Sequence, residues 1–144
     1  MRVWRLTRRP FADLSGEGAR RYGGRWTSPG KAVVYTAESP SLALLEVLVH
    51  LDLTPDLLPA HYVMMEIEVP DDAWRLDIAS LPADHPDPRA TGDAWLAGGV
   101  ESVLAVSSVV VPRQTNYLLS PLHPDAARFR IVMVAEFVID RRLL

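Results

Sequence analysis

The clearest structural signal of the chain lies at residues 30–51, which read GKAVVYTAESPSLALLEVLVHL. The apolar run AVVYTA at 32–37 predicts a buried strand, and the residues that follow it predict a helix over 39–51. Ser39 supplies a hydroxyl that can cap this helix, and Pro40 suits its first position. The sequence therefore predicts a strand that passes directly into a helix.

Further strands and one further helix are predicted on both sides of this stretch. Apolar or alternating patterns predict strands at 3–6, 62–69 and 131–140, and a strand or a strand pair at 103–111. A short helix is predicted from Thr91 to the glycines at 98 and 99. Residues 8–31, 70–90 and 116–125 are punctuated by Gly or Pro and are predicted as connecting loops. Strands outnumber helices without alternating regularly with them. This pattern favours an α+β fold in one domain, residues 1–144.

Composition limits the class of protein. Hydrophobic residues make up 49% of the 144 positions and charged residues 23%, as in a globular domain with a sizeable core. The absence of cysteine excludes disulfides, thiolate metal sites and a cysteine nucleophile. The N-terminus lacks the apolar core of a signal peptide, and no apolar run approaches the roughly 20 residues of a membrane span. We therefore expect a cytoplasmic protein without a membrane partner.

Positive charge is concentrated near the N-terminus. Residues 1–31 hold eight basic and two acidic side chains, for a charge of +6, whereas the rest of the chain carries −9. A basic segment on an acidic body indicates a local anion-binding site rather than a nucleic-acid surface. The alternative is that these arginines pair with acidic residues of the body. Aromatic residues beside them also leave open a non-catalytic nucleic-acid-binding module, although the pI of about 5.8 argues against it.

Four residues in or near apolar segments are candidates for chemistry. Arg25 follows two glycines in GGRW, a pattern that suits a phosphate or diphosphate but also an ordinary surface turn. Glu46 is the sole acid of the predicted helix; it faces a cleft, or it belongs with His50 to a solvent-exposed stripe. No third ligand of suitable spacing joins these two, so we expect no metal site. Tyr35 is either a core aromatic or a platform for a ring. Arg5, if buried, needs an anionic partner, either Glu46 or a ligand phosphate.

Three blocks of the sequence resemble the RES-domain toxins. They read DLSGEGARRYGGRWTSPGKAVVYTAESPSLALLEVLVHL, GDAWLAGG and VSSVVVPRQTNYLLSPLHPDAARFRI, they occur in the family's order, and they span nearly the whole chain. The resemblance implies a fold like that of the ADP-ribosyltransferase toxins, NAD as substrate, and an Xre-type helix-turn-helix antitoxin as partner. It implies depletion of cellular NAD by phosphorolysis or hydrolysis of the nicotinamide–ribose bond, or, as in another branch, ADP-ribosylation of a target protein.

The resemblance also implies which residues act. It carries the family's site residues onto Arg5, Arg25, Tyr35, Glu46 and Ser108. We expect Glu46, Arg25 and Tyr35 to be catalytic, and we expect NAD to be bound by Arg5, Arg25, Tyr35, Ser108 and Asn116. The chain departs from the family pattern at Ser107, where proline is frequent, and at Ser120, within NYLLSP.

The chemistry of NAD agrees with a single carboxylate. Nicotinamide leaves as a neutral molecule and needs no proton, whereas an ordinary glycosidase uses two carboxylates, one of them to protonate the leaving group. Glu46 would bind the ribose hydroxyls and stabilise the oxocarbenium-like cation, while Arg25 and Arg5 would hold the diphosphate. Tyr35 would pack on the nicotinamide or its ribose, and Ser108 would offer a hydrogen bond. Phosphate, water and a protein side chain all fit as the acceptor.

Overall fold

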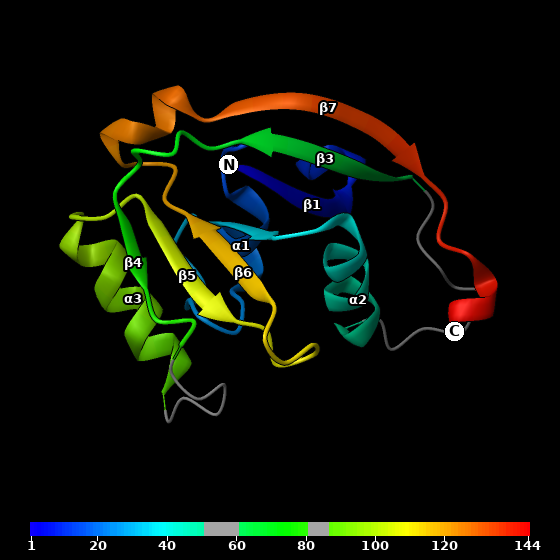
Figure 1. Cartoon of the computed structure of the whole chain (residues 1–144), viewed down its shortest axis with the longest axis horizontal. Helices are drawn as coiled ribbons and strands as arrows, with labels where there is room; N and C mark the ends of the chain where they lie inside the picture. The colour runs from blue at the N-terminus through cyan, green and yellow to red at the C-terminus, as the bar shows by residue number, and fades with distance from the viewer. Residues whose placement is uncertain (51–60, 81–86) are drawn as a thin grey trace.

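Seven strands build one mixed sheet in the computed structural model, which describes residues 1–50, 61–80 and 87–144 (Figure 1). Within these ranges the strand order is β4-β5-β6-β2-β1-β3-β7. Only β4 and β5 run parallel in the described sheet; the other neighbours are antiparallel. The strands are β1 (Arg2–Arg8), β2 (Val34–Ala37), β3 (Tyr62–Glu68), β4 (Arg75–Asp77), β5 (Val103–Ser107), β6 (Thr115–Leu119) and β7 (Arg130–Phe137).

Helices cover parts of this sheet. The described α-helices are α1 (Glu17–Tyr22), α2 (Pro40–His50) and α3 (Pro88–Gly98), and short 3-10 turns occupy η1 (Arg9–Phe11), η3 (Pro124–Arg128) and η4 (Arg141–Leu143). Helix α2 packs against β1 and β2. The combination of a mixed sheet with a few short helices confirms the predicted α+β class. In the described part of the chain, no helix has the length and apolar character needed to cross a bilayer.

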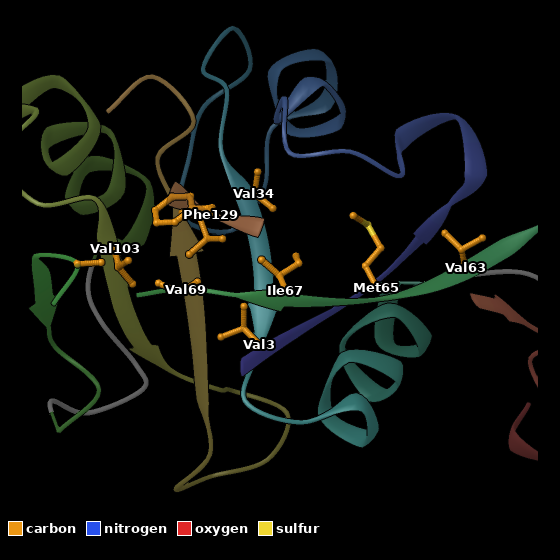
Figure 2. Close-up of a cluster of buried hydrophobic side chains, with 10 residues drawn as sticks. Val3, Val34, Val63, Met65, Ile67, Val69, Val103 and Phe129 are labelled. Carbon is orange, nitrogen blue, oxygen red and sulfur yellow. The ribbon is translucent and has the colours of Figure 1, made fainter. Parts of the chain in front are cut away.

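Alternation along the strands gives the sheet two apolar faces. Val63, Met65 and Ile67 of β3 point to one face and form the largest cluster of buried side chains with residues such as Val34 and Phe129 (Figure 2). Tyr62 and Met64 belong instead to a cluster under α2. A third cluster joins Trp95 of α3 to Leu104, Val106 and Leu118 of β5 and β6. Burial on both faces explains why the strands have such apolar sequences.

The sheet opens between its central strand, β2, and the neighbouring strand β1. In the described chain β1 and β2 share a single register pair, Trp4 with Ala37. On its other side, β1 pairs along its full length with β3, and β2 pairs on its other side with β6. The remaining residues of β1 and β2 thus border an opening in the sheet instead of continuing the β1–β2 ladder.

The helix predicted from the opening stretch is confirmed where it is described. Ser39 Oγ accepts a hydrogen bond from the Leu42 N–H at 3.1 Å, and Pro40 is the first helical residue, as the cap signal predicts. The helix is described to His50, so the expected last residue, Leu51, lies outside the described residues. The strands expected near residues 3, 32, 62 and 131 are present as β1, β2, β3 and β7.

Three of the predicted loops are wrong in part. Residues 116–125 begin within strand β6, because β5 and β2 pair with it on both sides and override the local turn signals. Residues 8–31 contain α1, and residues 70–90 contain β4 and the start of α3, which begins at Pro88 rather than at Thr91. The strand expected over 103–111 ends at Ser107, because the Ser108 side chain binds the backbone that follows it.

Candidate active site

A cavity of about 530 Å³ lies where β1 and β2 separate. Its walls also include residues of α1 and α2, the loop that follows α1, and the start of β6. Five of the six residues expected to act on NAD line this cavity: Arg5, Arg25, Tyr35, Glu46 and Asn116. The sixth, Ser108, contacts Glu46 from behind, and its neighbour Ser107 lines the cavity instead. The structure therefore gathers the expected residues around one space.

Glu46 projects from the middle of α2 and is held by two neutral donors. Its Oε1 atom accepts a hydrogen bond from Ser108 Oγ at 2.7 Å and another from Asn116 Nδ2 at 2.6 Å. Within the described residues its Oε2 atom has no hydrogen-bond partner. Hydrogen bonds to an ionised acceptor are short and strong, so they fix the direction of this carboxylate. Glu46 therefore belongs to the cavity wall and not to a solvent-exposed stripe.

Ser108 connects Glu46 to the end of β5. Its side chain is fully buried, and its Oγ atom also accepts hydrogen bonds from the N–H groups of Val110 and Val111 at 3.1 and 3.0 Å. These bonds turn the backbone out of the strand and orient the hydroxyl proton toward Glu46. The position of Ser108 suits the support of Glu46 better than contact with a ligand.

Asn116 has an unsatisfied acceptor in the cavity wall. Its amide nitrogen donates to Glu46, while its Oδ1 atom is buried without a hydrogen-bond donor in the described part of the chain. Burial of an amide oxygen without a partner costs free energy, which a donor on a bound molecule would recover. Glu46 Oε2 can therefore accept a hydrogen bond from a ligand, and Asn116 Oδ1 supplies a second acceptor that lacks a partner in the described residues.

Tyr35 anchors the glycine turn that precedes Arg25. Its hydroxyl oxygen accepts from the Trp26 N–H at 3.1 Å and lies 2.9 Å from Thr27 Oγ1. Burial raises the pKa of Tyr35 and outweighs these hydrogen bonds, so the side chain remains a neutral phenol. A Cβ atom at Gly24 would lie 2.5 Å from the Tyr35 oxygen. The close approach that this glycine permits is therefore to Tyr35, not only to a ligand as the sequence suggested.

Helix α3 holds the same turn from outside the cavity. Asp93 accepts from the backbone N–H of Ser28 at 2.9 Å and from its hydroxyl at 2.6 Å. Arg89 Nε donates to the carbonyl oxygen of Gly24 at 3.0 Å. A Cβ atom at Gly92 would collide with the carbonyl oxygen of Trp26. Gly92 and Asp93 lie in the GDAW block and Arg89 just before it, and none of the three was predicted to have a role. Their contacts span about 65 positions, so local spacing in the sequence carries no signal of them.

The arginines of the basic segment divide into two groups. Arg2, Arg9, Arg20 and Arg21 form ion pairs with glutamates, which confirms for these four the alternative of pairing within the protein. Arg5, Arg8 and Arg25 line the cavity. Arg5 Nη1 donates to the carbonyl oxygen of Asp13 at 2.9 Å. Of the two partners expected for a buried Arg5, Glu46 is not among its contacts in the described residues, and a ligand phosphate stays a prediction. Burial lowers the pKa of Arg5, although the charge of Asp13 opposes this shift.

The residues that the structure describes contain no group of three or more histidines, aspartates or glutamates that could hold a metal ion. Glu46 and His50 both line the cavity, one turn of α2 apart. Their surroundings offer hydroxyl, amide and guanidinium groups, which suit a polar organic anion with several hydroxyl groups.

Comparison with known proteins identifies the family. The family model of the RES domain matches residues 2–141. A protein of Pseudomonas putida named Toxin Res is 40% identical over 150 residues, which cover 99% of each chain. The Prs ADP-ribosylating toxin of a Sphingobium strain is 37% identical, over 92% of this chain and 87% of the relative. A chain of the M. tuberculosis MbcT–MbcA toxin–antitoxin complex shares the fold, with a TM-score of 0.73 and 21% identity over 95% of this chain and 84% of that one. The chain therefore belongs to the RES-domain family and is a RES-domain toxin.

Proposed function

We propose that this toxin cleaves NAD at the bond between nicotinamide and ribose, and thereby depletes NAD in the cytoplasm. One observation carries the proposal. The carboxylate of Glu46 lies in the wall of a cavity shared with Arg5 and Arg25, and its own contacts are with the neutral side chains of Ser108 and Asn116. Such a carboxylate is fixed in direction and keeps its negative charge for a ligand.

The reaction needs this charge at one moment. When the bond between C1 of the ribose and the nicotinamide nitrogen breaks, its electron pair goes to the ring, which loses its positive charge and leaves without a proton. Positive charge then develops on the ribose. Glu46 stabilises that cation electrostatically, because the carboxylate is already oriented before the bond breaks. Its Oε2 atom accepts a hydrogen bond from a ribose hydroxyl.

The substrate has features that match the remaining residues. Arg25 and Arg5 supply positive charge for the diphosphate, and a guanidinium can donate two parallel hydrogen bonds to phosphate oxygens. Asn116 Oδ1, which is buried and has no donor in the described residues, accepts from a second ribose hydroxyl or from the carboxamide of nicotinamide. Tyr35 keeps the turn that carries Arg25 in place.

An acceptor completes the reaction. Inorganic phosphate attacks C1 of the ribose and yields ADP-ribose 1''-phosphate, or water attacks and yields ADP-ribose. The test is to incubate the purified chain with NAD, with and without phosphate, and to separate the products by chromatography and mass spectrometry. We expect free nicotinamide in either case, and the phosphorylated product when phosphate is the acceptor. NAD that stays intact in the presence of phosphate, water and a cell extract would contradict the proposal.

Transfer to a protein is the second candidate function. The Sphingobium relative, 37% identical, carries the name of an ADP-ribosylating toxin, and the same donor site serves a protein acceptor. Incubation with NAD and a cell extract would then give a protein heavier by one ADP-ribosyl group. If free ADP-ribose or its phosphate is the product instead, the first function stands.

We also propose an antitoxin partner, because a solved structure with the same fold is a toxin–antitoxin complex. The Xre-type helix-turn-helix class of this partner rests on the family resemblance. Co-expression with a small helix-turn-helix protein encoded next to the toxin gene is the test, and we expect it to protect cells that produce the toxin. If NAD depletion and growth arrest persist despite co-expression, that protein is not the antitoxin.

A further inference from the structure

A second depression adjoins the cavity beyond Arg25. It has a volume of about 650 Å³, shares Tyr22, Arg25 and His50 with the cavity, and adds Asp87 and Arg89 from the start of α3. We call it the outer depression. Because Arg25 lines both spaces, it stands at their boundary. A molecule that extends from Glu46 past Arg25 would therefore enter the outer depression.

Arg89 is fixed beside this boundary. Its Nε atom donates to the carbonyl oxygen of Gly24 at 3.0 Å, next to Arg25 in the chain. This bond uses one of the five donors of the guanidinium and leaves those of its two terminal nitrogens, and Arg89 lines the outer depression together with Arg25. Asp87, the one acid of the outer depression among the described residues, is held by the helix start, where its Oδ1 atom accepts from the Ala90 N–H at 3.0 Å.

An exposed aromatic ring completes the outer depression. Tyr22 is 70% exposed at the end of α1, although it lines both spaces. A depression lined by a flat ring and two arginines matches a ligand that carries a base and phosphates, because bases stack on aromatic faces and phosphates pair with arginine.

We propose that the outer depression binds the adenosine-phosphate half of NAD, with Arg89 and Arg25 on the diphosphate and the adenine against Tyr22. This inference rests on the proposed function, which places the nicotinamide ribose at Glu46. Arg25 then meets the diphosphate at the boundary, and the rest of the dinucleotide lies beyond it. Arg89 and Tyr22 thus select a dinucleotide over a mononucleotide.

The test compares NAD with nicotinamide mononucleotide, which has the same scissile bond but lacks the adenosine-phosphate half. Steady-state nicotinamide release gives kcat/KM for each substrate, and their ratio cancels any loss shared by both. We expect Arg89→Met to lower the ratio of NAD to mononucleotide about tenfold, the effect of one charge-assisted hydrogen bond. Tyr22→Ala, at an exposed position, should lower the same ratio about threefold, in line with the loss of one stacking contact.

Arg9→Met is the matched control. Arg9 pairs with Glu136 and lines neither the cavity nor the outer depression, so its loss should leave the ratio unchanged. If Arg89→Met and Tyr22→Ala also leave the ratio unchanged, the inference is wrong even though NAD is cleaved.

A binding measurement separates this inference from the proposed function. Calorimetric titration with ADP, which carries only the adenosine and the diphosphate, requires no cleavage. We expect Arg89→Met to weaken ADP binding about tenfold relative to the wild type. ADP binding that depends on Arg89, together with no cleavage of NAD, would support the outer depression and overturn the proposed function. Equal ADP affinity of the two proteins would overturn the inference alone.

Discussion

Glu17 and Glu46 lie on successive helices, and their hydrogen-bond donors differ in charge. Glu17 of α1 accepts two hydrogen bonds from Arg20 at 2.6 Å and one from Arg21 at 2.9 Å. These bonds, chiefly the ones from Arg20, hold its pKa at about 2. Glu46 of α2 is held just as closely, but its donors are a hydroxyl and an amide, which carry no charge.

The difference separates a structural carboxylate from a functional one. An ion pair neutralises a carboxylate, whereas neutral donors orient it and leave its charge in place. A carboxylate that must stabilise a transient cation needs the second arrangement. The arginines also differ in position: those that pair with glutamates lie on the surface, whereas Arg5, Arg8 and Arg25 line the cavity.

The largest expected effect is at Glu46 itself. Glu46→Gln keeps the shape of the side chain and an acceptor oxygen but removes the charge, so kcat for nicotinamide release should fall about 10²- to 10³-fold. Thermal unfolding followed by circular dichroism checks that the fold is kept. Wild-type turnover in the folded variant would place the catalytic charge elsewhere.

Asn116→Leu tests whether the neutral donors matter. Leucine has a similar size but cannot donate to Glu46, and a hydrogen bond to a charged group contributes about 1.5–3 kcal/mol. We expect kcat to fall about 10- to 100-fold. The conservative variant Asn116→Gln should recover part of that loss if the donor is what counts, and equal losses in both variants would argue against an orienting role.

Gly92→Ala tests the support of Arg25 by α3. The added methyl group collides with the Trp26 carbonyl oxygen, so we expect unfolding free energy to fall by about 1–3 kcal/mol and KM for NAD to rise severalfold. Gly98→Ala in the same helix is the control, because its Cβ meets nothing within 4 Å. Denaturant unfolding and KM together check the prediction, and indistinguishable behaviour of the two variants would contradict it.

Glu17→Gln should have the smallest effect on catalysis, with kcat unchanged. Because the pKa of Glu17 is lower in the folded chain than its ordinary value of 4.5, its ion pairs stabilise the fold above that value. The stabilisation is lost as the pH falls toward 2. The melting temperature of the variant should therefore lie below that of the wild type at pH 7, and the gap should narrow between pH 4.5 and 2. A constant gap across that range would show that the charge of Glu17 does not stabilise the fold.

Local signals in the sequence predicted the elements that local contacts determine. Helix α2 carries its own cap at Ser39 and Pro40, and the prediction of its start is confirmed. Strand β6 was missed because Asn116 and Pro121 resemble turn residues, while its pairing partners β5 and β2 are distant in the sequence. Helix α1 was missed within a glycine-rich segment, although the spacing of Glu17, Arg20 and Arg21 is typical of a helix.

The candidate site shows the same division. The residue types and the family resemblance indicated Glu46, Arg25 and Tyr35 from the sequence. The contacts that hold Glu46 join residues 62 and 70 positions apart, and only the folded sheet brings them together. The pairing of Arg89 and Asp93 with the turn around Arg25 is equally distant and gave no local pattern.

The most direct test of the account is a crystal structure of Glu46→Gln with NAD. The variant should bind the dinucleotide without cleaving it at an appreciable rate. We expect the hydroxyls of the nicotinamide ribose within hydrogen-bond distance of residue 46 and Asn116, and the diphosphate within ion-pair distance of Arg25. A nicotinamide ribose bound outside the cavity, with the diphosphate away from Arg25, would contradict the account.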